Sequence, residues 1–591
     1  MATITSNQTG QHSLRLTCYQ NCDDVQLCWR TGQDDLSDVP IPGCLGFKIE
    51  RQRKNKDDQW GKVEVLRNRV GFDPAPPSTP DGDSRSEPSS IWPFQRYDWT
   101  DHGANNGETV RYRICAMKLP EGASLGTAKL EEIADSGWTA AISVEAYAGE
   151  GVSAYFNRGA VMSQYVARIA RKNKWSPAAI KAGIKDLQEP LRRFLSGELR
   201  VALLDLLDEA ISDFDVHIYL ALYELSDKEL IDKLCLLRGR AHVILANGSD
   251  KQGDGNEAAR STLNAADVDV YDRLLKSKGL GHNKFLVFTR NQGQDPEKVW
   301  TGSTNWAATG LCTQLNNGIL AEDPVLAQHY LDQWHEIQKA GSTFSQELVA
   351  RNAASPYHAG NIDAWFTRVR NKSTKNVGLG SDLQALVDAV ASAEQCILYV
   401  MFQPGLEPLT SILEKSKDIY VRGVVSTVTE HAEEEFSLKG VGPGTKEYHT
   451  ALVQPDGIGK SFASWVKEVT RNQFLFPNVN PGIGHAITHA KMFVIDPFSE
   501  NCKVVTGSHN FSGSASEQND ENFLIISGHR QLAEAYAVAC MSTYAHYRWR
   551  AYVKEKADAG EAIWDHLDDD PAWQGKRLSA AQKRHLQVWC P

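Results

Sequence analysis

The chain contains Gly281-His282-Asn-Lys284-Phe-Leu-Val-Phe288, then Thr301-Gly-Ser303-Thr-Asn305, and repeats this as Thr488-His489-Ala-Lys491-Met-Phe-Val-Ile495, then Thr506-Gly-Ser508-His-Asn510. In each copy a His-x-Lys pair precedes an apolar run, and a Gly-Ser-x-Asn turn follows 20 or 18 residues after the histidine. Either motif alone is common in surface strands and turns. Two copies in the same order with nearly the same spacing indicate a duplication.

The spacing within each motif predicts a shared surface. Residues i and i+2 of a strand point to the same side, so His282 and Lys284 project together, as do His489 and Lys491. A turn and a neighbouring strand can return the serine and asparagine to the same place. Two such sets packed face to face would hold a phosphodiester, attack it through one imidazole and protonate the leaving oxygen from the other. We expect no metal or cofactor, because the lysines already supply the clamping charge.

The regions around the motifs also repeat. Residues 203–223 and 383–402 each read as a helix followed by a buried strand, and Asp208 aligns with Asp388 without a gap. From these aspartates to the motif histidines the chain runs 74 and 101 residues, so the second copy has about 27 extra residues, between about 429 and 481. We expect this insertion to be a functional flap or a disordered segment.

Strand patterns dominate residues 1–150, where alternating polar and apolar residues predict an antiparallel β-sandwich. The stretch 92–116 loosely resembles the later strands of a fibronectin type III domain. The predicted fold is therefore α/β, with two related halves at 151–365 and 366–591 after a β-sandwich domain at 1–150. We expect a helical tail after about residue 550 that packs on the body through its tryptophans.

Composition narrows the function. The 591 residues are 41% hydrophobic and 23% charged, with a net charge of -11, which is typical of a folded protein with several domains. Such a charge argues against coating nucleic acid as the main task. No apolar stretch long enough to span a membrane occurs, and no signal peptide is seen at the N-terminus. We expect a cytoplasmic protein, or one exported without an N-terminal signal peptide.

From about residue 200 to 550, the motifs make the chain resemble the phospholipase D superfamily, whose signature is His-x-Lys-x4-Asp followed by Gly-Ser-x-Asn. The resemblance implies two α/β halves with a single active site at their seam, so that a monomer suffices. It implies hydrolysis through a covalent phosphohistidine intermediate, with catalytic residues His282, Lys284, His489 and Lys491. The phosphate-binding residues it implies are Ser303, Asn305, Ser508 and Asn510.

The two copies differ in their carboxylates. His489-x-Lys491 continues to Asp496, whereas the first copy has Thr289 at that position. After the second turn, the string Asn519-Asp-Glu521-Asn522 resembles the family's Asn-x-Glu-Asn extension, and counting from the serines aligns Glu521 with Asn316. By this resemblance Glu521 supports His282 as the nucleophile, and Asn316 is the neutral partner of His489, the general acid.

The reverse assignment stays open, because Asp496 belongs to the motif of His489. We include Asp496 among the catalytic residues for that reason. Asp520 is interpreted as a turn residue only.

The motifs predict the reaction but not the alcohols on either side of phosphorus. The acidic chain, the duplicated motifs and the insertion favour a phospholipid, hydrolysed in the manner of phospholipase D. A nuclease or DNA phosphodiesterase is the alternative, because the second copy also resembles the nuclease branch. A third hypothesis is a pseudoenzyme in which the sandwich binds a partner. The partner of the sandwich, and hydrolysis as opposed to transphosphatidylation, cannot be read from the sequence.

Overall fold

The computed structural model describes residues 2–9, 11–32, 38–73, 86–159, 173, 175, 177–248, 253–275, 279–454, 487–562 and 566–591. Within the predicted insertion it includes α11 (Glu430–Leu438) and α12 (Lys446–Ala451). The rest of the insertion, from residue 455 onward, lies outside the described residues, so the flap remains a prediction.

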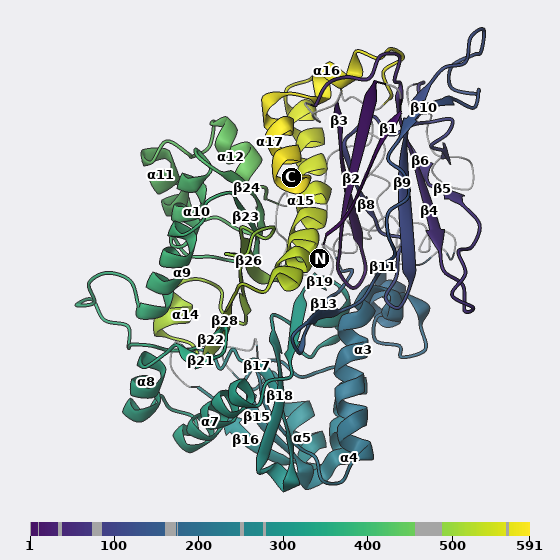
Figure 1. Ribbon diagram of the computed structural model, residues 1–591. Coiled ribbons are helices and arrows are strands. Elements are labelled where there is room, and N and C mark those ends of the chain that lie inside the picture. The colour runs from purple at the N-terminus through teal and green to yellow at the C-terminus, as the bar shows by residue number, and fades with distance from the viewer. Residues whose placement is uncertain are drawn as a thin grey trace.

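The predicted β-sandwich is confirmed at the N-terminal end of the chain (Figure 1). Its two antiparallel sheets enclose apolar side chains that alternate along the strands, such as Leu14, Leu16, Ile49 and Ile114. The resemblance to fibronectin type III stays a prediction. One sheet has the order β1 (Thr3–Thr9), β2 (His12–Gln20), β3 (Val25–Gly32), β8 (Asp98–Asp101); the other has β10 (Glu131–Asp135), β9 (Thr109–Lys118), β4 (Gly46–Arg53), β5 (Glu64–Val65), with β11 (Ile142–Ser143) beside β9.

Two larger sheets follow, and each contains one copy of the motifs. The first runs β12 (Tyr147–Gly149), β13 (Val152–Phe156), β20 (Asn317–Ala321), β18 (Asp295–Gly302), β17 (Lys284–Arg290), β14 (His217–Leu222), β15 (Ala241–Ala246), β16 (Asp269–Arg273). The second runs β21 (Tyr357–Ala359), β22 (Ile362–Thr367), β28 (Glu521–Ser527), β27 (Lys503–Gly507), β26 (Lys491–Ile495), β23 (Cys396–Met401), β24 (Tyr420–Val425). The predicted α/β repeat is therefore confirmed.

The seven strands of the second sheet match the first seven of the eight-stranded first sheet in order, with one correction to the sequence alignment. Leu222 pairs with Lys284 in the first half and Met401 pairs with Lys491 in the second, so the buried strands correspond at an offset of 179 residues. The preceding helices, α3 (Pro190–Ser212) and α9 (Ser381–Ala391), align at 180, as Asp208 and Asp388 do. The ungapped alignment is wrong by one residue, which the first half has in the last turn of its helix, because four residues connect helix and strand in both halves, 213–216 and 392–395.

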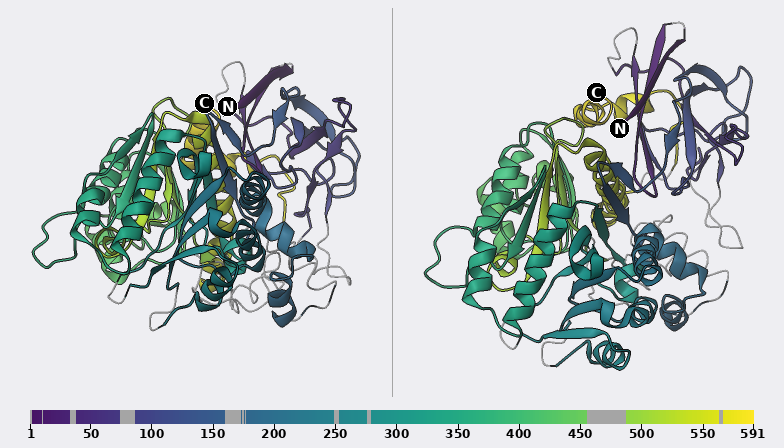
Figure 2. Two further views of the ribbon diagram at one scale, coloured as in Figure 1. Left: turned by 90° about the horizontal axis from the view of Figure 1, so that it is seen from below. Right: turned by 60° about the horizontal axis from the view of Figure 1, so that its bottom comes forward.

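Other helices pack against the faces of the two large sheets (Figure 2). In the first half these are α4 (Lys228–Leu237), α5 (Glu257–Ala265), α6 (Ala308–Cys312), α7 (Pro324–Ala340) and α8 (Gln346–Ala353). In the second half they are α10 (Leu409–Lys415), α14 (Gly513–Glu517) and α15 (Arg530–Asp558). Helix α15 contacts β2 of the sandwich as well as β13 and β23, so it connects all three parts of the molecule (Figure 1).

The sandwich is not a separate appendage. The boundary expected at residue 150 falls inside the hairpin β12–β13, which belongs to the first large sheet. At the other end of the chain, α16 (Trp573–Arg577) and α17 (Ala580–Trp589) pack against the sandwich. The Trp573 indole donates to the carbonyl of Cys44 at 2.9 Å, and Trp589 lies edge-on to Tyr19. The predicted packing of these tail tryptophans is confirmed; Trp564 lies outside the described residues.

Candidate active site

The motif histidines lie at the seam between the halves, and each is bound to the other half through its backbone. The N–H of His282 donates to the carbonyl of Asp520 at 2.9 Å, and the N–H of His489 donates to the carbonyl of Leu315 at 2.9 Å. Their side chains are 5% and 6% exposed. This exchange brings the two motif copies together at a single place.

The side chains cross the seam in the same way. Nδ1 of His282 lies 2.9 Å from Oε2 of Glu521, and Nδ1 of His489 lies 2.8 Å from Oδ1 of Asn316. A carboxylate only accepts hydrogen bonds, and the Asn316 amide is oriented by its Nδ2, which donates to the carbonyl of Gly310 at 2.8 Å. Nδ1 therefore has the proton in both neutral imidazoles, and Nε2 has the lone pair.

Each lysine folds back over its own motif. Lys284 Nζ donates to the carbonyl of His282 at 2.7 Å, and Lys491 Nζ donates to that of His489 at 2.6 Å. The ammonium groups also lie 5.0 Å from the ring centres of Tyr223 and Phe402. The predicted shared face of histidine and lysine is present in both halves.

Sequence reasoning missed the two aromatic residues. The Tyr223 ring lies 4.7 Å from the ring of His282, and the Phe402 ring lies 4.9 Å from that of His489. The signal was available, because each follows the buried strand of its repeat at matching positions. These rings support both members of each His-Lys pair from one side.

The electrostatics of the site favour neutral groups. Burial lowers the pKa of His282 to about 4, although Glu521 acts in the opposite direction. Burial and the charges of Lys491 and Lys284 lower the pKa of His489 well below its ordinary value. Both imidazoles are therefore unprotonated at neutral pH before an anion binds.

The same buried surroundings also shift the pKa values of the two lysines and of Glu521. Burial lowers the pKa of Lys284 to about 7, against the carboxylates of Glu521 and Glu224. Burial and the charge of Lys284 lower the pKa of Lys491. Burial acts to raise the pKa of Glu521, but His282 outweighs it, so that the net shift is downward. A phosphate anion entering here would compensate the buried positive charges and raise the pKa values of these bases.

The motif asparagines differ in their partners. Asn305 Nδ2 donates to Oε2 of the half-buried Glu224 at 2.8 Å, and the position equivalent to Glu224 in the second half is Gln403. The Oδ1 atoms of Asn305 and Asn510 are buried and have no hydrogen-bond partner among the residues that the structure describes. Glu224, which sequence reasoning missed, places a carboxylate beside one of the two expected phosphate ligands.

The serines require a correction. Ser303 Oγ donates to Oδ1 of Asn316 at 2.8 Å and accepts from the N–H of Asn317 at 3.0 Å. Ser508 Oγ accepts from the N–H of Asn522 at 3.0 Å. Both serines are fully buried. Their hydroxyls join the turns to the following strands. We had expected these hydroxyls to face a phosphate, and they do not.

Asp496 also requires a correction. It follows β26 at the end remote from Lys491, and its carboxylate accepts from the backbone N–H groups of Glu394, Gln395 and Cys396 at 2.7–2.8 Å. Thr289 occupies the equivalent position in the first half, where its hydroxyl donates to the carbonyl of His217 at 2.8 Å. Asp496 is therefore a structural residue that fixes the start of β23, and it does not contact either imidazole.

Asp520 is more than a turn residue. Its carboxylate forms an ion pair with Arg273 across the seam at 2.7 Å, and both side chains are 1% exposed. Arg273 also donates to the carbonyl of Thr343 at 2.5 Å. This buried ion pair fixes the backbone next to Glu521, because leaving either charge alone would be costly.

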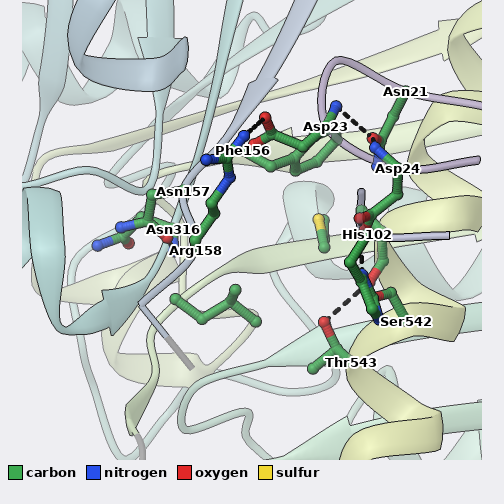
Figure 3. A pocket seen from close by; sticks show the side chains of 13 residues that line it. Asn21, Asp23, Asp24, His102, Phe156, Asn157, Arg158, Asn316, Ser542 and Thr543 are labelled. Carbon is green, nitrogen blue, oxygen red and sulfur yellow. Dashed lines mark hydrogen bonds and ion pairs between the residues drawn. The ribbon is translucent and has the colours of Figure 1, made fainter. Parts of the chain in front are cut away.

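A cavity of about 40 Å³ lies behind the site, between the sandwich and the two halves (Figure 3). Neither motif histidine nor either lysine lines it, but Asn316 does. That volume has room for water molecules but is too small for a phosphodiester substrate. Within the part of the chain that the structure describes, no cluster of side chains could hold a metal ion, and no helix is long and apolar enough to cross a membrane.

The family model described as "Cardiolipin synthase, PLD-like domain" matches residues 203–337 and 388–539. Both copies of the motifs lie within these matched segments.

Similar solved structures include polyphosphate kinase from Porphyromonas gingivalis (10% identity, TM-score 0.37, 83% of this chain and 73% of that chain). Phosphatidylserine synthase from Haemophilus influenzae Rd KW20 is another (11% identity, TM-score 0.37, 61% and 91%). A third is Nuc from Salmonella typhimurium, a phospholipase D family member (19% identity, TM-score 0.20, 25% and 91%). No curated protein matches the chain.

Proposed function

We propose that the protein is a phosphodiesterase that cleaves its substrate through a covalent phosphohistidine. The observation that supports this most directly is the pair of cross-seam contacts, His282 to Glu521 and His489 to Asn316. They leave two Nε2 atoms available and give only one imidazole an anionic partner. A nucleophile and a general acid need this division, because the nucleophile becomes a cation and the acid must give up its proton.

The reaction proceeds in two steps. Nε2 of His282 attacks phosphorus, the bond from phosphorus to the leaving oxygen breaks, and His489 donates its Nε2 proton to that oxygen. A water molecule then attacks phosphorus and gives a proton to His489, and the phosphorus–nitrogen bond breaks to release a phosphomonoester and free His282. The bound diester anion raises the pKa of His489, so the substrate itself helps to protonate the acid.

The lysines stabilise the charge on phosphorus. Lys284 and Lys491 are buried, and each is oriented by a hydrogen bond to its own histidine carbonyl and by an aromatic ring. Preorganised cations in a site with little water stabilise a developing anion strongly. Asn305 and Asn510 complete the phosphate site, with Glu224 orienting the first of them.

A loop beside the site favours a lipid over a nucleic acid. Residues 368–380 connect β22 to α9 and form the long loop at the left of Figure 1. The loop starts beside Glu521, because Thr367 at the end of β22 pairs with Glu521 at the start of β28. Val377 on this loop is 91% exposed, and Lys372 and Lys375 are exposed on the same loop. Exposed apolar and basic side chains together suit an anionic bilayer.

The loop is held in shape by its own contacts. Arg370 donates to the carbonyl of Gly378 at 2.7 Å and pairs with Glu517 at 2.8 Å. At its far end, Asp382 lies 3.1 Å from His509, the residue between Ser508 and Asn510. The net charge of -11 and the carboxylate of Glu224 further disfavour a polyanionic substrate. We therefore propose a phospholipid diester as the substrate.

The activity is tested with bis(p-nitrophenyl) phosphate, with Lys284→Met as the inactive control. Equal turnover by the wild type and the variant would reject the proposed activity and favour the hypothesis of a binding module.

The substrate class is tested with vesicles of phosphatidylcholine containing phosphatidylglycerol, alongside single-stranded DNA. Val377→Asp should lower the rate on vesicles about tenfold, because a valine contributes over 1 kcal/mol when buried, and leave the soluble diester unaffected. Cleavage of DNA but not of lipid would support the nuclease alternative.

A further inference from the structure

The second strand of the first large sheet, β13, leads directly to the site. Asn157 follows β13, is 4% exposed, and lies beside Asn316 (Figure 3). Its N–H donates to the carbonyl of Asn316 at 3.3 Å, and its Oδ1 accepts from the N–H of Asn316 at 2.9 Å. The main chain of Asn316, whose side chain accepts from His489, is thus held on both sides by one residue.

The amide nitrogen of Asn157 binds the end of α6. Nδ2 donates to the carbonyls of Gly310, Leu311 and Gln314 at 3.2, 2.8 and 2.7 Å. The last carbonyls of a helix have no partner within the helix, so this amide satisfies groups that would otherwise be buried and unpaired. The Gly310 carbonyl also accepts from Nδ2 of Asn316. Asn157 therefore supports the backbone that sets the orientation of the Asn316 amide.

The second half contains an equivalent arrangement. Phe156 pairs with Asn317 and Phe366 pairs with Asn522, so Asn157 corresponds to Thr367. Thr367 Oγ1 accepts from the N–H of Glu521 at 3.1 Å, just as Asn157 Oδ1 accepts from that of Asn316. In both halves a side chain at the end of this strand supports the residue that contacts the other half's histidine.

The next residue anchors this segment to the sandwich. Arg158 forms an ion pair with Asp23, which follows β2, and its guanidinium lies 5.1 Å from the Phe194 ring. The N–H of Arg158 donates to the carbonyl of Leu195 at 2.8 Å. The cavity of Figure 3 lies between these groups and Asn316, so the sandwich forms one wall behind the site.

We propose that Asn157 is a positioning residue for His489: by fixing Asn316 it keeps the Nδ1–H of His489 hydrogen-bonded to Asn316 Oδ1 and directs Nε2 toward the leaving oxygen. This inference rests on the proposed function, in which His489 is the general acid. It also gives the N-terminal region a part in the reaction, because Asn157 belongs to the segment that Arg158 ties to the sandwich.

The test compares a leaving group that needs a proton from the general acid with one that does not. A p-nitrophenolate leaves without protonation, whereas an alkoxide must be protonated, so loss of the general acid affects the two unequally. We expect Asn157→Ala to lower kcat/KM, which reports departure of the leaving group and not the later hydrolysis, at least about tenfold more on a short-chain phosphatidylcholine at monomeric concentration than on bis(p-nitrophenyl) phosphate. Equal losses on both substrates, or no loss on either, would overturn the inference.

Two controls separate positioning from stability. Asn352→Ala removes another fully buried asparagine, whose amide atoms have no hydrogen-bond partner, and should leave the ratio of the two rates unchanged. Asn157→Thr copies the residue of the other half and keeps an oxygen for the N–H of Asn316, so it should restore part of the ratio. If Asn157→Ala fails to fold, the threonine variant alone still tests the inference, because it lacks the bonds to α6.

A double-mutant cycle tests whether Asn157 affects the reaction through Asn316. If Asn157 acts through Asn316, Asn157→Ala should change the ratio of the two rates less than about twofold in an Asn316→Ala background. An undiminished effect there would show that it acts elsewhere. Wild-type protein without activity on either diester would reject the proposed function, an outcome distinct from any result with the variants.

Discussion

The two halves of the α/β repeat hold equivalent histidines with chemically different partners. His282 faces the carboxylate of Glu521 at 2.9 Å, and His489 faces the amide of Asn316 at 2.8 Å. The surroundings otherwise correspond, with a lysine bound to the histidine carbonyl and an aromatic ring beneath each pair. The duplication thus supplies the shape of the site, while one position, glutamate or asparagine, divides the roles.

The largest expected effect comes from replacing each histidine in turn with alanine. His282→Ala should abolish turnover of every diester, with a loss of at least about 10⁴-fold, because it removes the nucleophile. His489→Ala should still release p-nitrophenol in a burst and then stop, since the phosphohistidine cannot be hydrolysed without the base. Mass spectrometry of the trapped protein locates the phosphoryl group. A phosphate on position 489 in a His282→Ala protein would show that the roles are reversed.

Removing the carboxylate should make the halves more alike. We expect Glu521→Gln to lower kcat by roughly 10²–10⁴-fold with little change in KM, because the amide cannot stabilise the imidazolium that forms on attack. The matched control is Asp382→Asn, which neutralises another fully buried carboxylate paired with a histidine, His509, and should cost far less. Equal losses would mean that burial of charge, and not support of the nucleophile, is what was measured.

Smaller effects are expected from pH, which tests the pKa values of the groups in the first half of the site. On bis(p-nitrophenyl) phosphate, whose leaving group needs no proton from His489, the proposed nucleophile His282 acts in its neutral form, and its pKa of about 4 predicts that kcat/KM falls tenfold per unit only below pH 4. Lys284 acts as a cation, and its pKa of about 7 predicts a fall above pH 7. The optimum should therefore lie between pH 4 and 7.

An acid limb near pH 6.5, the ordinary value for histidine, would contradict the low pKa of the nucleophile. Lys284→Arg, which stays charged throughout, provides the control for the alkaline limb. If the limb persists in that variant, it belongs to Lys491, whose pKa is also lowered.

Much of this site was predictable because its signals are local. The spacing of His282 and Lys284 on one strand places both on one face, whatever the rest of the chain does. Counting from the serines was enough to align Glu521 with Asn316, since the turn and the following strand have the same length in both copies. The sandwich and the α/β repeat were predictable for the same reason, from alternation and internal similarity.

Other features escaped prediction because they depend on partners distant in sequence. Asp520 reads as a turn residue until Arg273, 247 positions away, is placed against it. Asp496 reads as catalytic within its motif, but its carboxylate caps the backbone some 100 residues earlier. The burial of the serine hydroxyls depends on the strand that follows each turn.

The sequence by itself determined which chemical groups are present, how each His-Lys pair is presented, and that there are two of them. Only the tertiary structure decided which partner each histidine has and that Asn157 supports one of them. The physical reason is that strand periodicity acts over a few residues, whereas hydrogen bonds across the seam require segments hundreds of residues apart to be packed together. The same packing desolvates the lysines and imidazoles and so sets their pKa values.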